Sequence, residues 1–363
     1  MKITFNKQFM VLKFLLLKCF AKQITLKLTE AGTLPNKIGI GEKILVTNLK
    51  IIGEINGTDL RFIREMAGSD VKGNSTSGNL SVLDLSEAKF VAGGDYYYKD
   101  YEDGCYTSND IIGKYAFRDC RSLTSVIIPS SVTEIREYAF DGCISLINVN
   151  IPSSVTEIGC GAFGACSSLT SVNIPSSVTK IEGGTFNYCT SLTSVNIPSN
   201  VTSIGTRAFW CCWFLASVNI PSSVAEIGCG AFSGCHSLTN VNIPSSVTSI
   251  GKYAFAQCSG LKSIYVYAET VPSIGAGAFN GFDSENCTLY VPKGTYDVCR
   301  YSWGYYFENI VEFDATNIRN IVAEPEVQEN ARYAVNGQRL TAPVKGINLV
   351  KYNNGRVKKE IVK

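Results

Sequence analysis

The sequence predicts a repeat solenoid, a stack of short parallel β-strands and turns with little helix and with a cap at each end. Phenylalanines recur every 23 residues, with a cysteine three positions after each and a leucine three positions further on. An alternation of apolar and polar residues before a proline marks a short strand in each repeat. The chain has 363 residues, which is too long for one ordinary core. Together the period, the alternation and the length favour an elongated stack.

The repeat runs seven times in one register. Its phenylalanines are Phe117, Phe140, Phe163, Phe186, Phe209, Phe232 and Phe255, its cysteines are Cys120, Cys143, Cys166, Cys189, Cys212, Cys235 and Cys258, and its leucines are Leu123, Leu146, Leu169, Leu192, Leu215, Leu238 and Leu261. A degenerate copy ends at Phe279. Because the apolar positions persist while the others vary, we expect equivalent side chains to stack in files around one dry interior.

One unit, residues 155–177, shows how a coil is built. The segment from Leu169 to Ile174 predicts a strand with one buried face, and Pro175 ends it because proline has no amide hydrogen. A single unit cannot bury both of its walls, so neighbouring strands are expected to pair in a parallel ladder. Glycines are expected where the backbone needs either a positive φ or a close approach; they are Gly159, Gly205, Gly228 and Gly251.

Residues 1–21 have the features of a signal peptide. Two lysines precede an apolar stretch from Phe9 to Phe20, and small residues precede a cleavage point after Ala21. Lys13 and Lys18 interrupt the apolar stretch. An extended upstream strand is therefore the alternative.

Residues 22–110 lack the motif and predict an N-terminal cap of one or two divergent turns. Leu45–Ile55 and Leu80–Leu85 predict strands, and Asp59–Met66 predicts a helix with Thr58 as its N-cap. The tyrosine-rich and acidic residues 95–106 predict a long solvated loop, with some tyrosines packed on the cap. A sticky loop or a calcium site is the alternative, although the carboxylates lack the spacing of a calcium loop.

The remainder of the chain divides into three parts by composition. Residues 280–313 predict a C-terminal cap, with a strand at Leu289–Pro292 followed by a helix and turn whose aromatic rings pack the end of the stack. Residues 314–330 are acidic and non-periodic, as in a linker. Residues 331–363 predict a short β tail.

The repeat over residues 111–279 resembles the BspA-type leucine-rich repeat. The resemblance implies an α/β-type leucine-rich-repeat solenoid, a curved right-handed stack, with a binding or adhesive role at the bacterial surface and no catalysis. The segments Tyr333–Leu340 and Gly346–Lys351 resemble the C-terminal sorting segments of type IX-secreted proteins. That second resemblance implies export and attachment to the outer membrane or cell surface, and a small terminal hairpin pair without an address function is the alternative.

The cysteine file is expected to consist of buried free thiols. Stacked side chains would place Cβ atoms about 4.8 Å apart, beyond the ~3.5–4.5 Å of a disulfide. A linear file without a C-x₂₋₄-C pair also lacks the tetrahedral geometry of zinc. Disulfides between Cys160 and Cys166, or between Cys229 and Cys235, remain open. His236 follows Cys235, but neighbours in an extended turn point to opposite sides, so we expect no catalytic pair.

Charge and composition restrict the partner. The net charge is +2 and only 18% of residues are charged, which argues against a nucleic-acid binder. We expect no enzyme activity, no cofactor and no metal. The predicted function is that of a secreted or cell-surface, monomeric protein that binds a protein or glycan. The alternative is a structural spacer of the cell envelope without a specific ligand.

Two surfaces are candidates for that partner. The outward strand positions form a flat, uncharged face of hydroxyls and amides, which suits hydrogen bonding to glycans or peptide backbone and equally suits a plain solvated face. One repeat replaces small residues by Trp210, Trp213 and Phe214, and clustered exposed aromatic residues are typical of a contact site. The alternative is that they pack sideways over adjacent turns. The strand-face candidates are Thr170, Ser171, Asn173, Thr193, Ser194, Asn196, Ser217, Asn219, Asn240 and Asn242.

Overall fold

The chain divides into two compact units, residues 1–312 and 313–363. The computed structural model describes residues 22–314, except 40 and 102, together with the backbone of four strands beyond residue 328. Those four strands form an antiparallel sheet in the order β24-β23-β25-β26. They are β23 (Glu329–Ala334), β24 (Arg339–Leu340), β25 (Gly346–Tyr352) and β26 (Val357–Val362).

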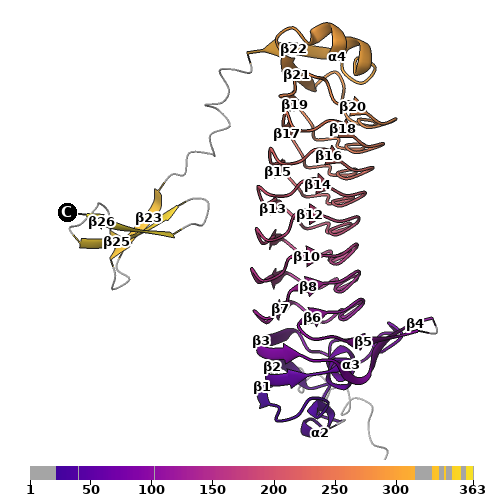
Figure 1. The fold of residues 1–363 in the computed structure, drawn as a ribbon, viewed down its shortest axis with the longest axis vertical. Helices are drawn as coiled ribbons and strands as arrows, with labels where there is room; N and C mark the ends of the chain where they lie inside the picture. The colour runs from indigo at the N-terminus through magenta and orange to yellow at the C-terminus, as the bar shows by residue number, and fades with distance from the viewer. Residues whose placement is uncertain are drawn as a thin grey trace, which may run out of the picture. The chain divides into compact units, whose positions relative to one another are not determined.

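The first unit is a stack of coils with two parallel ladders of strands (Figure 1). One ladder contains β1 (Lys22–Lys27), β2 (Val46–Ile55), β3 (Val82–Phe90), β7 (Ser125–Ile127), β9 (Asn148–Asn150), β11 (Ser171–Asn173), β13 (Ser194–Asn196), β15 (Ser217–Asn219), β17 (Asn240–Ile243), β19 (Ser263–Val266), β21 (Thr288–Pro292) and β22 (Asn309–Phe313). The other contains β6 (Ile111–Ile112), β8 (Glu134–Ile135), β10 (Glu157–Ile158), β12 (Lys180–Ile181), β14 (Ser203–Ile204), β16 (Glu226–Ile227), β18 (Ser249–Ile250) and β20 (Ser273–Ile274).

The register of the ladders confirms the 23-residue stacking. Val172 lies opposite Val195, and Val195 lies opposite Val218, so each residue pairs with its equivalent in the next coil. Both ladders are interrupted at one level, between β9 and β11 and between β10 and β12. The repeat alone suggests a continuous ladder, but each ladder consists of two separate sheets.

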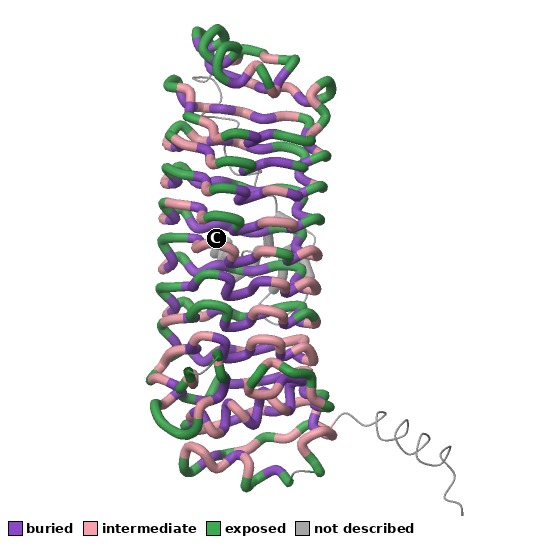
Figure 2. The backbone as a smooth tube through the Cα atoms, turned by 90° about the vertical axis from the view of Figure 1, so that its right-hand side faces the viewer, coloured by how far each residue is buried: buried purple, intermediate pink, exposed green. Residues whose placement is uncertain are grey.

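The phenylalanine file forms the centre of the buried interior. Eight rings, from Phe117 to Phe279, stack with centroids 5.0–5.7 Å apart and with planes within 12° of parallel. All eight are buried, and Figure 2 shows buried residues continuing through successive coils. Because each ring contacts the ring above and below, the file couples neighbouring coils by burial of apolar surface.

The cysteine file contributes hydrogen bonds as well as packing. Six thiols each donate to the carbonyl oxygen of the phenylalanine in the preceding coil, with Sγ···O distances of 3.1–3.3 Å. The seven file cysteines are fully buried and free, as the sequence predicts. A buried carbonyl that would otherwise accept only one hydrogen bond thus gains a second, weak donor.

Two groups of glycines serve different purposes. Gly159, Gly205 and Gly228 have ordinary φ values, but an added Cβ would lie within 2.6–2.7 Å of the backbone of the preceding coil. Close approach is therefore their reason, and the positive-φ alternative is wrong for this file. Positive φ occurs two residues after each of these glycines, for example at Gly161 and Gly230.

The positive-φ file two residues before each phenylalanine also accepts larger side chains. Tyr115, Tyr138, Arg207 and Tyr253 occupy it with φ values of 55–60°, and Gly230 has a φ of 61°. Such a conformation costs a residue with a Cβ roughly 1 kcal/mol. At Gly230 an added Cβ would have no neighbour closer than 3.4 Å, whereas at Gly161 and Gly277 it would lie 2.4–2.5 Å from the ring of Tyr138 or Tyr253.

The N-terminal cap continues the first ladder with β1, β2 and β3. Helix α3 (Gly57–Met66) follows β2, and Asn56, not Thr58, is its N-cap. The Asn56 side chain accepts from the Thr58 amide while Asp59 accepts from the Asn56 amide, a reciprocal capping box. The buried Asp59 carboxylate also accepts from the Leu34 amide at 2.9 Å, which fixes the short helix α2 (Leu34–Lys37).

The tyrosine-rich segment is an antiparallel hairpin, so the predicted loop is wrong. Its strands are β4 (Gly93–Asp100) and β5 (Asp103–Thr107), and the hairpin projects from the side of the stack (Figure 1). Tyr97 and Tyr98 are buried against the cap, as predicted, whereas Tyr101 at the tip is 95% exposed. Tyr97 and Tyr98 are consecutive, so both faces of the hairpin are covered at this point, and simple alternation does not account for the pattern.

The C-terminal cap closes the phenylalanine file with aromatic rings. Helix α4 (Tyr296–Ser302) leads to Trp303 and Phe307, which lie 5.5 and 5.1 Å from the Phe279 ring. The Trp303 indole N–H donates to the Pro272 carbonyl at 3.2 Å, so its polar atom is satisfied inside the cap. Strand β22, which the sequence did not predict, follows β21 at the end of the sheet.

Candidate functional site

The predicted hydroxyl and amide face lies on the outer side of strands β11 to β17. Its residues alternate with buried valines, so every second side chain points to solvent. Threonine hydroxyls at the start of this face donate to the preceding coil, as Thr193 does to the Thr170 carbonyl at 3.2 Å. The exposed candidates are Thr170, Ser171, Asn173, Thr193, Ser194, Asn196, Ser217, Asn219 and Asn240, while Asn242 is half-buried.

The three aromatic candidates of one coil, Trp210, Trp213 and Phe214, fall into two groups. Trp210 is half-buried, its ring lies 4.8 Å from the Tyr188 ring of the preceding coil, and the Arg207 guanidinium lies 4.9 Å from its centroid. Trp210 therefore packs sideways, which is the alternative considered above. Trp213 and Phe214 follow on the far side of the buried Cys212 and are 45% and 59% exposed.

Phe214 stands in a file of serines, and the file of Trp213 is mixed, with serine and threonine as well as Arg121, Ile144 and His236. The equivalents of Trp213 in the two preceding coils are Thr190 and Ser167, and those of Phe214 are serines. The Phe214 amide still donates to the Thr190 carbonyl at 3.3 Å, so the backbone of the coil is unchanged by the two large side chains. The pair is an addition to the outer surface and not a part of the coil's construction.

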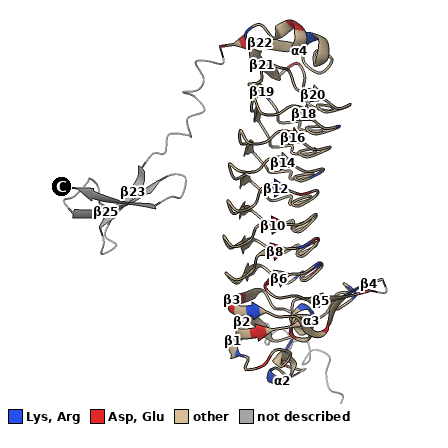
Figure 3. Cartoon of the chain, viewed as in Figure 1, with Lys and Arg blue, Asp and Glu red and all other residues tan. Residues whose placement is uncertain are grey.

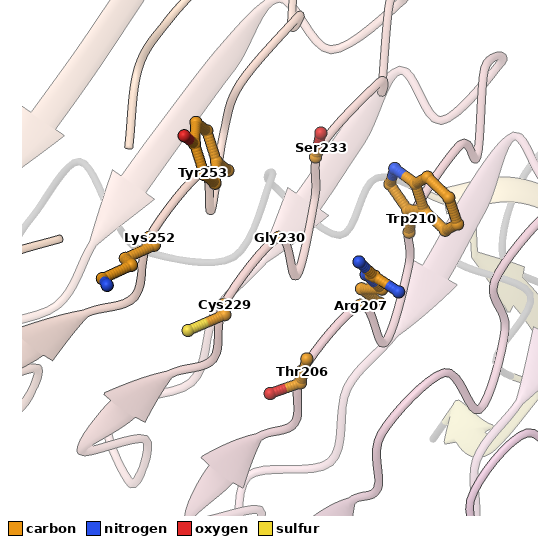
Figure 4. A pocket seen from close by; sticks show the side chains of 8 residues that line it. All are labelled: Thr206, Arg207, Trp210, Cys229, Gly230, Ser233, Lys252 and Tyr253. Atoms are coloured by element: carbon orange, nitrogen blue, oxygen red, sulfur yellow. The ribbon is translucent and has the colours of Figure 1, made fainter. Parts of the chain in front are cut away.

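A shallow pocket of about 290 Å³ lies on the turn side of the same coils (Figure 4). Only Trp210 among its lining residues was a candidate from the sequence. The signal that could have revealed the pocket is a glycine between two large side chains of one file, Arg207 and Tyr253. Its lining residues are Thr206, Arg207, Trp210, Cys229, Gly230, Ser233, Lys252 and Tyr253.

This part of the stack carries excess positive charge. Between residues 183 and 268 there is one carboxylate, Glu226, against three cationic side chains. Figure 3 shows that charged residues are sparse along the coils. Within the described residues, ion pairs form in the N-terminal cap and the first coils and do not include Arg207 or Lys252. Among the described side chains, no carboxylate thus forms an ion pair with either of the two cations that border the pocket.

Cys235 and His236 point to different environments, as their positions in the turn predict. The Cys235 thiol is buried and donates to the Phe209 carbonyl, and burial raises its pKa well above the ordinary value. His236 is exposed, and its Nδ1 lies 3.4 Å from the Ser259 hydroxyl. Across the described ranges, no three His, Cys, Asp or Glu side chains are grouped so that they could hold a metal ion.

The thiols fall into an accessible and an inaccessible class, which gives a testable prediction. Cys160 and Cys229 are exposed and free, while Cys166 and Cys235 are buried. We expect iodoacetamide at pH 8 to modify Cys160 and Cys229 in the native protein and the file cysteines only after unfolding, because the reactive species is an accessible thiolate. Peptide mass spectrometry with and without urea measures this. Native labelling of Cys166 at the rate of Cys160 would contradict it.

Among the described residues, none of the helices has both the length and the apolar composition needed to cross a membrane.

Two parallel ladders joined coil by coil around files of phenylalanine, leucine and isoleucine define a leucine-rich-repeat solenoid. The family model for the BspA type leucine rich repeat region matches residues 110–239 and 215–341, in six copies. The chain therefore belongs to this family.

Three solved structures are similar over part of the chain. A leucine rich repeat protein of T. pallidum is 32% identical over 52% of this chain and 86% of its own, with a TM-score of 0.44. A leucine-rich repeat protein of Bacteroides ovatus is 25% identical over 60% and 67%, with a TM-score of 0.39. A leucine rich cell surface protein of Faecalibacterium prausnitzii is 21% identical over 77% and 84%, with a TM-score of 0.31. A comparison with curated proteins gave no match.

Proposed function

We propose that this chain is a non-catalytic surface or secreted protein that binds a protein or glycan through the outer surface of its solenoid. The observation that carries the proposal is the exposed pair Trp213 and Phe214. Their equivalents in the two preceding coils are serine or threonine, and the pair leaves the backbone bond from Phe214 to Thr190 in place. Large apolar side chains cost solubility when exposed and contribute about 1.5–3 kcal/mol each when a partner buries them.

The neighbouring strand face supports the same function. Ser194, Asn196, Ser217 and Asn219 offer donors and acceptors next to the coil that carries Trp213. An aromatic anchor beside adaptable polar groups is the usual composition of a recognition surface. Membership in the BspA type leucine rich repeat family is consistent with a binding role. Because a fold does not by itself define a function, the proposal rests on the exposed aromatic pair and the polar face beside it.

A structural spacer of the cell envelope is the competing function. The packing of Trp210 on Tyr188 favours it, because one aromatic residue of this coil serves the stack itself. In a binding protein the exposed pair Trp213 and Phe214 contacts the partner, whereas in a spacer the pair has no partner. A spacer would lose nothing when Trp213 and Phe214 become small polar residues.

Attachment through the C-terminal tail is a further part of the proposal. Residues 329–362 contain a four-stranded antiparallel sheet, in which β23 with β24 and β25 with β26 form the pair of hairpins considered above. The tail is a separate compact unit, as an export or anchoring segment would be. Deleting residues 331–363 is expected to release the protein from the cell surface into the medium, which surface proteolysis and fractionation of cells would measure.

The test restores the consensus at the aromatic pair. We expect Trp213→Ser with Phe214→Ser to lower binding to arrayed glycans and matrix proteins at least tenfold, because the partner loses its apolar anchor. The far-UV circular dichroism and the urea midpoint should stay unchanged, since exposed substitutions alter stability by about 0.5 kcal/mol or less. Binding of the full chain to the array is the measurement.

The matched control lies at an equivalent place in another coil. Ile144 occupies the file of Trp213 three coils earlier and is 45% exposed. Ile144→Ser should leave binding unchanged. If the double variant keeps full binding and full stability, the exposed pair is not a contact site and the spacer function is favoured.

A further inference from the structure

We propose that the pocket beside Trp210 binds an acidic saccharide, a sugar ring that carries a carboxylate or sulfate group. The inference rests on the proposed binding function and names a second site and a ligand class for it. Its residues come from three successive coils, with Arg207 and Trp210 in the first, Gly230 in the second, and Tyr253 in the third.

The pocket lies where the positive-φ file has a glycine, Gly230, directly between two large side chains, whereas the glycines at 161 and 277 of the same file are covered by tyrosine rings. Arg207, Gly230 and Tyr253 are successive members of the positive-φ file, and coil spacing separates the outer two by roughly 10 Å. An added Cβ at Gly230 would lie 3.4 Å from the Arg207 Cγ and 4.0 Å from the Ser233 Cβ. Where the file is filled, at Tyr115 and Tyr138, the rings stack at 5.6 Å and leave no gap.

The charge of the pocket selects an anion. Arg207 and Lys252 border it from opposite coils, and neither forms an ion pair within the described residues. Trp210 positions the Arg207 guanidinium by a cation–π contact at 4.9 Å. A guanidinium fixed in this way offers paired donors to a carboxylate or sulfate without first losing rotamer freedom.

The remaining walls suit a sugar ring. Tyr253 is 54% exposed and offers an aromatic face against which the C–H groups of a sugar can pack. Thr206 and Ser233, which Figure 4 shows among the lining residues, add hydroxyls that can donate and accept hydrogen bonds. The volume of about 290 Å³ is at the low end for ligand sites, which limits the occupant to one or two rings.

The experiment measures binding of defined probes to the full chain. The acidic probes are a heparin-derived tetrasaccharide, a hyaluronan tetrasaccharide and 3′-sialyllactose, which separate sulfate, uronate and sialic acid as sources of the charge. Lactose tests the need for the charge, and hexaglutamate tests the need for the sugar. We expect at least one acidic saccharide to bind tenfold or more tightly than lactose and hexaglutamate, with an affinity that falls as salt rises.

Gly230→Tyr is the blocking variant, because tyrosine already occupies this file at Tyr115, Tyr138 and Tyr253 with the same φ. We expect it to weaken the acidic saccharide at least tenfold by stacking on Tyr253 and filling the gap. Gly161→Tyr is the control, since it adds the same side chain to the same file outside the pocket. Its Cβ would lie 2.5 Å from the Tyr138 ring, so that ring must move aside, and circular dichroism checks that the variant is folded. The affinity of the Gly161→Tyr protein for the acidic saccharide should equal that of the parent protein.

Charge variants separate this inference from the proposed function. Arg207→Met and Lys252→Met should each weaken the acidic saccharide and reduce its salt dependence, while Trp213→Ser should not. Any one of three results would overturn the inference. Hexaglutamate could bind as tightly as the acidic saccharide, no acidic saccharide could bind, or Gly230→Tyr could bind the acidic saccharide as tightly as the parent protein. If the array signal is lost in the Trp213 and Phe214 double variant but kept in Gly230→Tyr, the binding function stands and the saccharide pocket does not.

Discussion

Replacing Phe209 by alanine is expected to lower the free energy of unfolding by about 3–5 kcal/mol, the range found when a buried phenylalanine is truncated. The Phe209 ring is fully buried and lies 5.5 Å from the Phe186 ring and 5.3 Å from the Phe232 ring. Its removal therefore leaves a cavity that faces two coils at once. Urea unfolding followed by circular dichroism measures the loss.

The comparison variant is Phe214→Ala, which removes the same side chain from a position that is 59% exposed five residues later. Its effect on the urea midpoint should be small, within about 0.5 kcal/mol. A loss below 1 kcal/mol for Phe209→Ala would mean that the file does not couple the coils. Because a repeat stack can unfold in parts, a split transition in Phe209→Ala would itself locate the weakened coil.

The buried files could be predicted from the sequence because their physical cause is periodic. Each coil presents the same side chain at the same place, so Phe163, Phe186 and Phe209 must lie over one another if the coils stack at all. The outward positions followed from the same argument, since alternation along a short strand leaves one side exposed. The prediction of Ser171 and Asn173 as exposed, on either side of Val172, is confirmed.

The local geometry of the caps could not be predicted from the sequence by periodicity. Asn56 and Thr58 both have side chains that can cap a helix, and only the extended backbone of Asn56, with φ −123° and ψ −168°, decides between them. The hairpin formed by β4 and β5 depends on packing against α3, which no local pattern contains. Non-repeating segments lack the many copies that made the coil's register evident.

The pocket was missed for a related reason. Glycine also occurs in this file at Gly161, Gly184 and Gly277, and so Gly230 carried no signal by itself. Its importance comes from having Arg207 and Tyr253 as neighbours in space, 23 residues away on each side. Such a site becomes visible only when the sequence is written coil above coil and each file is examined for gaps.

We expect the cysteine file to make stability depend steeply on alkaline pH. Burial raises the pKa of Cys120 from 9.0 to about 11 and the pKa of Cys258 to about 12, and it also raises the pKa of each file cysteine between them. The folded protein therefore keeps these thiols protonated at a pH where the unfolded chain has lost the protons.

The sign of the effect follows from proton binding. Below pH 8 both states hold the thiol protons, and stability does not depend on them. Between pH 9 and about 11 the folded state binds more protons than the unfolded state, so the free energy of unfolding falls as pH rises. Each thiol contributes on the order of 1 kcal/mol per pH unit, and the seven together remove several kcal/mol for each unit.

Urea midpoints in reducing buffer from pH 7.5 to 10 test this expectation. The comparison protein carries Cys166→Ala, Cys189→Ala and Cys212→Ala, which remove three of the seven thiols from the middle of the file. It should be less stable at pH 7.5, because three thiol donors and their packing are gone, yet its stability should fall less steeply above pH 9. Parallel pH curves for the two proteins would mean that groups other than the buried thiols cause the alkaline loss, and a flat curve for the parent would mean that the file already ionises within the folded stack.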